Sequence, residues 1–387
     1  MTNMSKRELL AAIKPRYIKA SKGEKTVMLD EFCNSTGYNR DYAVRILQAG
    51  YDCGRVKRVG RKGRKKKYGH NLMAVVVKIW ELLEYPCGKR LKPNLVSTID
   101  ALVRHGEMKV SDQIMGLLGK IGATTLDRRL KRERVIRKLC RNRGTTRHGT
   151  LLKSSIPIRI TNWDIWEVGN LETDTVAHNG GDPSGECVYS LDLVEIYSGW
   201  SEQQAVMGKG EKGVVKAIDE MKAVMPFTVK GLDSDSGSEF INWHLVKYCQ
   251  TNNWFFTRSR PDRKNDNAYI EQKNRTHIRD WLGYGRYDTM EQVDLINDLC
   301  RKELRLFNNF FRPVMKIKTK EKVNNSVCKK TYDSAQTPCQ RLLNCDTLAP
   351  EQKQALAETY LALNPMALKR TINEKIKRIR KTGKPTN

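Results

Sequence analysis

The sequence lacks any hydrophobic run long enough to cross a membrane, because no apolar stretch approaches the roughly 20 residues that a spanning helix needs. Its amino terminus, Met-Thr-Asn-Met-Ser-Lys-Arg, also lacks the apolar core of a secretory signal peptide. We therefore expect a soluble, cytoplasmic protein with no membrane partner.

Closely spaced cysteine pairs are missing as well. The 10 cysteines and 6 histidines are scattered, and no two cysteines lie two to four residues apart. Structural zinc usually takes a tight pair of ligands at each end of a loop, so this spacing argues against a zinc site. Reduced and mostly buried cysteines are the expected state.

Acidic residues are in short supply. The chain of 387 residues has 43 Asp and Glu against 71 Lys and Arg, which gives a formal net charge of +28. So large a surplus attracts polyanions at long range, and nucleic acid is the expected partner ahead of an acidic membrane surface. The length predicts about two to four domains.

Residues 1–50 have a helical pattern that predicts a helix-turn-helix DNA-binding domain. Gly37 breaks the first helix and Asn39 starts the second. Arg40 and Arg45 lie on the second helix, which in that motif enters the major groove. An ordinary helical hairpin is the alternative. The apolar faces consist of Leu29, Phe32 and Cys33 on the first helix and Ala43, Val44 and Leu47 on the second.

Residues 51–70 are predicted to be a basic linker. The segment from Arg55 to Lys67 has 9 basic residues in 13, two glycines and no acid. Without apolar periodicity it is predicted to be a flexible arm that contacts DNA phosphates, with a solvated loop as the alternative. The candidate contacts are Arg61, Lys62, Arg64, Lys65, Lys66 and Lys67.

Residues 71–156 are predicted to form a second helical DNA-binding region. Helices are expected at 71–84 and 94–105, and a second helix-turn-helix at 111–138. In the latter, Ser111 caps the first helix, Gly122 makes the turn and Thr124 caps a helix that starts at Thr125. Arg128 and Arg129 are the candidate DNA contacts on that helix.

Residues 157–311 change to a β-rich period. Strands are expected at 169–177, 187–196 and 200–206, then a helix at 211–224, a strand ending near Leu232, a helix at 239–251, a strand at 254–258 and a helix from near Asn267. This order predicts a mixed α/β sheet. Residues 312–387 are predicted to be a basic C-terminal region with short strands at 314–318 and 327–332 and a helix at 350–363. Its tail from Lys369 is either a further nucleic-acid contact or a disordered end.

Three carboxylates within 157–311 have positions suited to phosphodiester chemistry. Asp174 falls in the middle of a strand, Asp235 follows the strand that ends near Leu232, and Glu271 lies in the first turns of the helix from near Asn267. A few converging carboxylates can hold two Mg²⁺ or Mn²⁺ ions, which activate the attacking oxygen and stabilise the leaving one. Strand alternation places Glu172 on the face of Asp174, and Asp233 is the equivalent rival of Asp235. The pattern alone leaves both choices open.

The text around these acids is Asp174-Thr-Val-Ala-His, Ser234-Asp-Ser-Gly-Ser-Glu-Phe240 and Lys264-Asn-Asp-Asn-Ala-Tyr-Ile-Glu271-Gln-Lys-Asn. With these motifs, residues 157–310 resemble the integrase core of retroviral integrases and of the DDE transposases of bacterial insertion sequences. The resemblance selects Asp174, Asp235 and Glu271 as the catalytic, metal-binding triad, with 35 residues between the last two. Two features depart from the family pattern: Ser236 replaces a common Asn, and Gln272 replaces a frequent Arg.

The resemblance implies a ribonuclease H-like core, two Mg²⁺ or Mn²⁺ ions and double-stranded DNA as substrate, both as element ends and as target. It implies a homo-oligomeric transposase that cleaves 3′ ends and transfers them, associated with the nucleoid of a bacterium. Two alternatives stay open, a catalytically silent DNA-binding regulator and a nuclease of the same fold that only hydrolyses. Near the triad, Lys264, Asn267 and Arg275 are the candidate phosphate contacts, and a solvated helix surface is the alternative for Lys273 and Arg275. His178 is a lesser candidate for lining the site, because a lone histidine is more often structural. Trp254, Phe255 and Phe256 are predicted to be core residues of their strand and not platforms for base stacking.

Overall fold

The chain forms two compact units, Met1–Lys67 and Tyr68–Asn387. None of the helices among the described residues combines the length and the apolar character needed to cross a membrane. The computed structural model describes residues 1–48, 67–137, 167–234, 240, 242–258, 270, 273–322 and 328–383.

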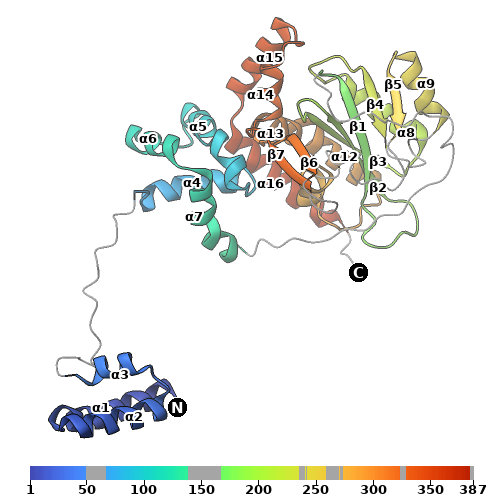
Figure 1. The fold of residues 1–387 in the computed structure, drawn as a ribbon. Helices are drawn as coiled ribbons and strands as arrows, with labels where there is room; N and C mark the ends of the chain where they lie inside the picture. The colour runs from blue at the N-terminus through green and yellow to red at the C-terminus, as the bar shows by residue number, and fades with distance from the viewer. Residues whose placement is uncertain are drawn as a thin grey trace. The chain divides into compact units, whose positions relative to one another are not determined.

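The described residues of the first unit form the helices α1 (Asn3–Lys19), α2 (Lys22–Thr36) and α3 (Arg40–Leu47) (Figure 1). Gly37 ends α2 with a positive φ of 67°, a conformation that glycine adopts without strain. The Asn39 side chain accepts a hydrogen bond from the N–H of Asp41 and caps α3. The turn between α2 and α3 therefore lies at the predicted position, between Gly37 and Asn39. The buried core of this unit consists of Leu10, Tyr17, Leu29, Phe32, Ala43, Ile46 and Leu47.

The second unit begins with four helices, α4 (His70–Leu82), α5 (Gly88–Arg104), α6 (Asp112–Lys120) and α7 (Ala123–Ile136). The prediction that α5 starts at 94 was wrong: the helix starts six residues earlier and carries Pro93 in its interior. The prediction of Thr124 as a cap was also wrong, because Gly122 occupies the N-cap position of α7.

A five-stranded mixed sheet follows, made of β1 (Asn170–Ala177), β2 (Val188–Glu195), β3 (Ser201–Met207), β4 (Gly231–Ser234) and β5 (Phe255–Arg258). The strand order is β3-β2-β1-β4-β5. β1, β2 and β3 pair in antiparallel fashion, whereas β4 is parallel to both β1 and β5. The mixed sheet with its helices is consistent with the expected integrase-core-like fold.

Helices cover both faces of this sheet. α8 (Glu211–Lys222) packs on β2 and β3, and α9 (Trp243–Thr251) packs on β5 and α8. On the opposite face, the π-helical segment η1 (Asn274–Arg279) packs against β1. Two contacts show that α8 and η1 lie on opposite faces of the sheet. The Gln204 side chain of β3 donates to Glu220 of α8, whereas Ser201 bonds His277 of η1, and side chains three residues apart on a strand point to opposite faces.

The chain continues through α11 (Asp280–Leu282), α12 (Met290–Leu299), the π-helical η2 (Cys300–Leu304) and α13 (Arg305–Phe311). Two asparagines from this stretch close the free edge of β3. Asn297 bonds both the N–H and the C=O of Ala205, at 2.7 and 3.0 Å. Asn309 does the same for Ser201, at 2.9 and 2.8 Å. The outward backbone groups of Ser201 and Ala205 on this edge strand are thus satisfied by side chains.

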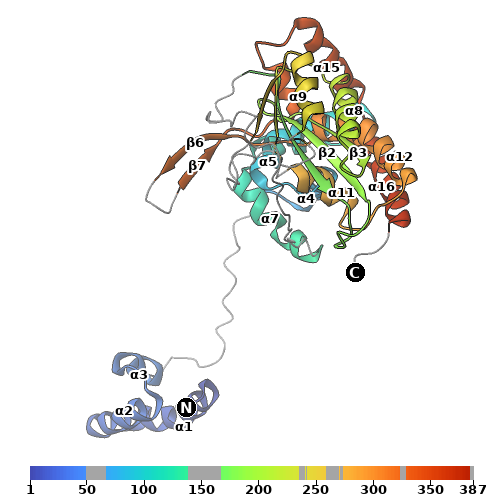
Figure 2. The same cartoon turned by 90° about the vertical axis from the view of Figure 1, so that its right-hand side faces the viewer.

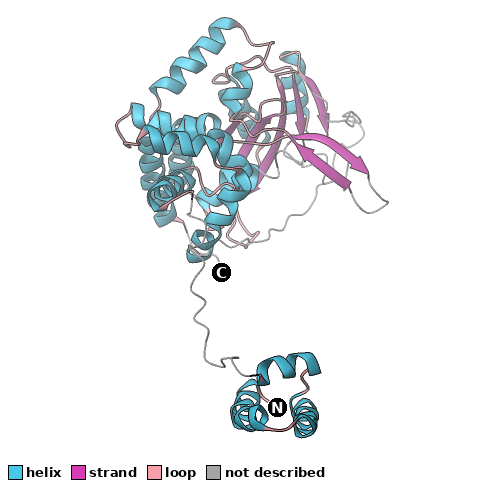
Figure 3. Cartoon of the chain, turned by 60° about the vertical axis from the view of Figure 1, so that its left-hand side comes forward, coloured by secondary structure: helices cyan, strands magenta, loops and turns pink. Residues whose placement is uncertain are grey.

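The C-terminal part comprises a hairpin of β6 (Ile317–Lys322) and β7 (Cys328–Tyr332) and the helices α14 (Pro338–Leu343), α15 (Pro350–Ala362) and α16 (Pro365–Thr382). The hairpin extends away from the other elements of its unit (Figure 2). Figure 3 shows the helices of this unit gathered beside the sheet. The alternative of a disordered tail from Lys369 was wrong for residues 369–383, because α16 packs on α12, and its Lys375 pairs with Asp298 and Glu303 at 2.6 Å.

Candidate active site

Asp174 lies in the second half of β1, half-buried, directly opposite Asp192 of β2. Its Oδ1 accepts a hydrogen bond from the N–H of Thr175 at 2.7 Å. Its Oδ2 accepts one from Nδ2 of Asn274, the first residue of η1, at 2.5 Å. The two donors act on different oxygens, so they fix the orientation of the carboxylate plane.

Two further acids beside Asp174 share its sheet face. Glu172 lies two residues earlier on β1, and Asp233 is its register partner on β4. They are 1% and 4% exposed, respectively. Asp233 Oδ1 accepts a hydrogen bond from Thr257 Oγ1 at 2.5 Å. Of the two acids on β1, Asp174 is therefore the one that solvent or a hydrated ion reaches more easily.

A buried charge pair lies next to the half-buried carboxylate. Asp192 is fully buried, and its Oδ1 accepts a hydrogen bond from Gln203 Nε2 at 2.9 Å. Burial raises the pKa of Asp192, and the Gln203 hydrogen bond and the charge of Lys273 oppose that rise. Burial lowers the pKa of Lys273, while the charge of Asp192 raises it. Each group therefore helps to keep the other ionised in a place that is largely shielded from bulk water.

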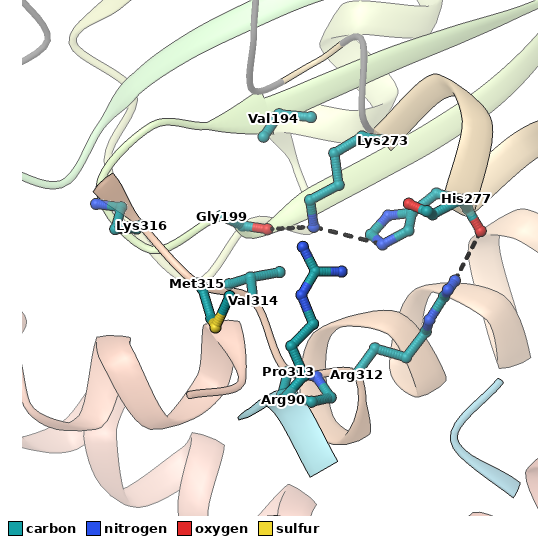
Figure 4. A pocket seen from close by; sticks show the side chains of 11 residues that line it. Arg90, Val194, Gly199, Lys273, His277, Arg312, Pro313, Val314, Met315 and Lys316 are labelled. Carbon is teal, nitrogen blue, oxygen red and sulfur yellow. Dashed lines mark hydrogen bonds between the residues drawn. The ribbon is translucent and has the colours of Figure 1, made fainter. Parts of the chain in front are cut away.

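Lys273 starts a short polar chain. Its Nζ donates to the carbonyl oxygen of Gly199 at 2.9 Å and lies 3.4 Å from His277 Nε2 (Figure 4). His277 Nδ1 lies 2.9 Å from Ser201 Oγ. Burial lowers the pKa of His277 well below its usual range, and the charge of Lys273 adds to this effect. A neutral His277 accepts from Lys273 at Nε2 and donates to Ser201 at Nδ1. The alternative of a solvated surface was therefore wrong for Lys273, which is 6% exposed.

Most of the predicted site lies outside the described residues. Asp235 directly follows Ser234, the last residue of β4, and Glu271 precedes Asn274 by three positions in the sequence. Neither belongs to the described part of the chain. The same holds for Arg61, Lys62, Arg64, Lys65, Lys66, Lys264 and Asn267.

The other candidate DNA contacts fall on described residues. In the first unit, Arg45 is exposed with its guanidinium 5.2 Å from the Tyr42 ring centre, and Arg40 pairs with Asp30. Lys67 is exposed.

In the second unit, Arg128 is exposed, whereas Arg129 donates to the carbonyl oxygen of Tyr68. Arg275 is exposed and lies 4.0 Å from Asp280. The three arginines Arg45, Arg128 and Arg275 thus have side chains that a phosphate could approach.

Two smaller expectations have different outcomes. His178 is fully buried, with Nε2 at 2.7 Å from Ser190 Oγ and its ring edge-on to Tyr287, so its environment is structural. Burial, with the charge of Arg279 nearby, lowers the pKa of His178 to about 3. Trp254 is buried as expected, but the assignment of Phe255 to the core was wrong, because this side chain on the edge strand β5 is 79% exposed.

Neither Asn274 nor Asp192 was predicted to belong to the site. Asp192 had a readable signal, since it is an acid between Leu191 and Leu193 in a mostly apolar part of the strand. Asn274 ends the third motif, but its contact with Asp174 joins residues far apart in the chain, and no local pattern encodes such a contact.

Carboxylate oxygens such as those of Asp174 are the donors that Mg²⁺ and Mn²⁺ prefer. Within the described residues, no group of three or more His, Cys, Asp or Glu side chains is placed to hold a metal ion. The predicted set contains Asp235 and Glu271, which that finding does not cover. Asp174 is the member of the predicted triad that lies within the described residues, and its oriented, half-buried carboxylate fits the expected ligand chemistry.

No protein-family model matches the chain. The uncharacterized protein y4rM of Sinorhizobium fredii is 33% identical to it over 329 residues, which cover 84% of this chain and 91% of y4rM. The chain belongs to the y4rM family. Among solved structures, the catalytic core domain of BIV integrase aligns with 45% of this chain and 93% of its own length, at 17% identity and a TM-score of 0.30. Since y4rM is itself uncharacterized, a proposal of function must rest on the site.

Proposed function

We propose that the chain is a transposase, which binds the ends of a mobile DNA element and catalyses metal-dependent 3′-end cleavage and strand transfer. The observation that carries the proposal is the 2.5 Å hydrogen bond from Asn274 Nδ2 to Asp174 Oδ2. This bond holds a residue only three positions after Glu271 against the strand that bears Asp174. It supports a common site for the first and last acids of the triad.

The sheet supports the second pairing. β4 runs parallel to β1 with Ser234 beside Thr173, and Asp235 and Asp174 are the next residues of these two segments. Parallel neighbours present their C-terminal ends at the same edge of a sheet, where α/β enzymes usually place their ligands. The register therefore favours Asp174 with Asp235 over the buried pair of Glu172 and Asp233.

Asp174, Asp235 and Glu271 would hold Mg²⁺ or Mn²⁺, two ions in the proposed site. When bound, the ions supply charge neutralisation at the phosphate and activation of the attacking oxygen. Asn274 and the Thr175 N–H keep the Asp174 carboxylate oriented. In cleavage, a water oxygen attacks phosphorus and the bond to the 3′ oxygen breaks, which leaves a 3′-OH and a 5′-phosphate. In strand transfer, that 3′-OH attacks a target phosphodiester, and the target's own 3′ oxygen leaves.

The net charge of +28 supports DNA as the substrate. The reaction needs two element ends held together, so we propose a homo-oligomer. Arg45, Arg128 and Arg275 are the described side chains that we propose contact DNA phosphates.

The test uses the purified full chain, a labelled duplex from the DNA that flanks its gene, Mg²⁺ or Mn²⁺, and a supercoiled plasmid. We expect metal-dependent 3′ nicking and transfer of label to the plasmid. Asp235→Asn and Asp174→Asn should each lower both reactions about 10³-fold or more while end binding persists, because each removes one metal-ligand charge. Glu351→Gln is the matched control, since Glu351 is an exposed acid on α15.

Three outcomes contradict the proposal in different ways. Nicking without joined product indicates a nuclease that only hydrolyses. Tight end binding without nicking under either metal indicates a silent DNA-binding regulator. Loss of end binding in Asp235→Asn, with Glu351→Gln unaffected, counts against the assignment of Asp235 as a metal ligand. A thermal-shift titration with Mn²⁺ gives a second reading, because the wild-type chain should be stabilised more than either triad variant.

A further inference from the structure

A small cavity of about 50 Å³ lies between α5, the β2–β3 turn, η1 and the segment from Arg312 to Lys316. Four cationic side chains line it, Arg90, Lys273, Arg312 and Lys316, together with the imidazole of His277. None of the described residues that line the cavity is acidic. Figure 4 shows the Arg90 guanidinium directed toward the Lys273 ammonium across this space.

Neutral oxygen atoms hold two of these cations in place. Lys273 donates to the carbonyl oxygen of Gly199 at 2.9 Å, and Arg312 Nη1 donates to the carbonyl oxygen of Thr276 at 2.7 Å. Arg312 Nη1 also lies 3.3 Å from Asn308 Oδ1. Within the described part of the unit, no carboxylate lies within ion-pair distance of either side chain. Their positions are therefore fixed by neutral acceptors, and the compensating charges, such as that of Asp192 for Lys273, lie beyond ion-pair distance.

Depth and accessibility differ among the lining residues. Lys273 and His277 are 6% and 2% exposed and form the floor, whereas Arg90, Arg312 and Lys316 are half-buried. Positive charges gathered away from water are costly unless an anion accompanies them. The volume has room for roughly three or four water-sized probes, which is close to the size of one tetrahedral oxyanion.

We propose that this cavity binds a phosphate group, with Lys273 at its floor and Arg90 and Arg312 as guanidinium donors at its sides. Guanidinium groups match phosphate oxygens with paired, charge-assisted hydrogen bonds, and an ammonium adds a point charge. None of the residues that line the cavity belongs to the predicted triad, and the inference does not depend on the strand-transfer function. The cavity does connect to the candidate active site along the chain, because Lys273 directly precedes Asn274.

The test measures inorganic phosphate binding to the full chain by calorimetry, without divalent metal, at constant ionic strength set with chloride. We expect saturable binding by the wild-type protein. Arg90→Gln should weaken it about tenfold or more, because it removes one charge-assisted donor. Lys89→Gln is the matched control, since it removes a positive charge from the neighbouring exposed position of α5 and should bind phosphate as the wild type does.

A second variant, Lys316→Gln, guards against a folding defect in Arg90→Gln, and both variants should match the wild type in circular dichroism. The absence of saturable phosphate binding by the wild type overturns the proposal. Equal affinities of Arg90→Gln, Lys316→Gln and the wild type overturn it too. Neither result bears on the proposed transposase function, because the experiment involves no metal and no cleavage.

The source of the phosphate group is resolved by competition. A single-stranded octamer with a 5′-phosphate is added to the phosphate complex, with the same octamer lacking that phosphate as the control. Displacement by the first octamer alone supports the site with a DNA end as its source. Failure of both octamers to displace phosphate supports the site with a small free phosphate compound as its source.

Discussion

Asn274 and Asn309 bring the same side chain to the same sheet in different surroundings. Asn274 is half-buried and reaches a side chain, the carboxylate of Asp174, which is itself half-buried. Asn309 is fully buried and reaches backbone, bonding both the N–H and the C=O of Ser201. Asn297 repeats the second arrangement at Ala205.

The difference separates a polar contact that completes the fold from one that prepares a site. Backbone groups at a buried edge need partners in every state of the folded protein, so Asn297 and Asn309 belong to its stability. A half-buried carboxylate keeps its solvation without a partner, so the Asn274 contact has little to offer stability. What Asn274 does supply is a fixed orientation, which matters only if Asp174 binds something.

The largest expected effect is on the closed edge. Asn309→Ala leaves the buried N–H and C=O of Ser201 without their partners, and we expect the free energy of unfolding to fall by about 2–3 kcal/mol. Urea denaturation followed by tryptophan fluorescence measures this change. The matched control is Asn373→Ala at an exposed position of α16, which should change stability by less than about 0.5 kcal/mol. Equal losses of stability in Asn309→Ala and Asn373→Ala would show that the Asn309 contacts do not stabilise the fold.

Asn274→Ala tests the other side. We expect stability to change by less than about 1 kcal/mol, whereas DNA cleavage slows about 10- to 100-fold, as is usual when the hydrogen-bond partner of a metal ligand is lost. The half-saturating Mn²⁺ concentration should rise with it, a shift that a purely structural role does not produce. Asn373→Ala is again the control, because its exposed side chain on α16 does not contact Asp174. An unchanged metal dependence in Asn274→Ala argues that Asn274 does not position a metal ligand.

The sequence predicts features that depend on local patterns better than features that depend on contacts between distant residues. The three antiparallel strands were predicted to within one residue at each end, because alternation and β-branched residues are local signals. That α16 forms a packed helix could not be predicted from its basic composition. The partners of its basic residues, such as Glu84 for Lys369 and Glu107 for Arg370, lie far away in the chain. A run of basic residues looks the same whether its charges are compensated within the fold or left for a ligand.

The candidate site divides in the same way. Local motifs pointed to Asp174, and its position in β1 agrees with the predicted strand. The strand pattern left the choice between Asp174 and Glu172 open, and the family resemblance selected Asp174. The roles of Asn274 and Lys273 needed contacts across the sheet. The exposed Phe255 was misplaced because aromatic runs indicate strands without telling an edge strand from a central one.

The smallest expected effect concerns His178, a third polar residue to compare with Asn274 and Asn309. It follows Asp174 by four residues, yet its burial puts it with the structural group. Burial lowers the pKa of folded His178 to about 3 from an ordinary value of 6.5. Above pH 6.5 the imidazole is neutral in both states. As pH falls from 6.5 toward 3, the unfolded chain gains a proton that the folded chain does not take up, so stability is lost.

His178→Gln should therefore make the loss of stability between pH 6.5 and 3 shallower, by up to about 1.4 kcal/mol per pH unit. Urea denaturation at several pH values measures the slope, and His277, which titrates in the same direction, leaves part of it in place. The control is His244→Gln, which removes an exposed histidine in place of a buried one. If His178 is structural, cleavage by His178→Gln at pH 7.5 stays within about twofold of the wild type, since such a change is under 0.5 kcal/mol in activation free energy. A large loss of cleavage with an unchanged pH slope would instead move His178 into the site beside Asp174.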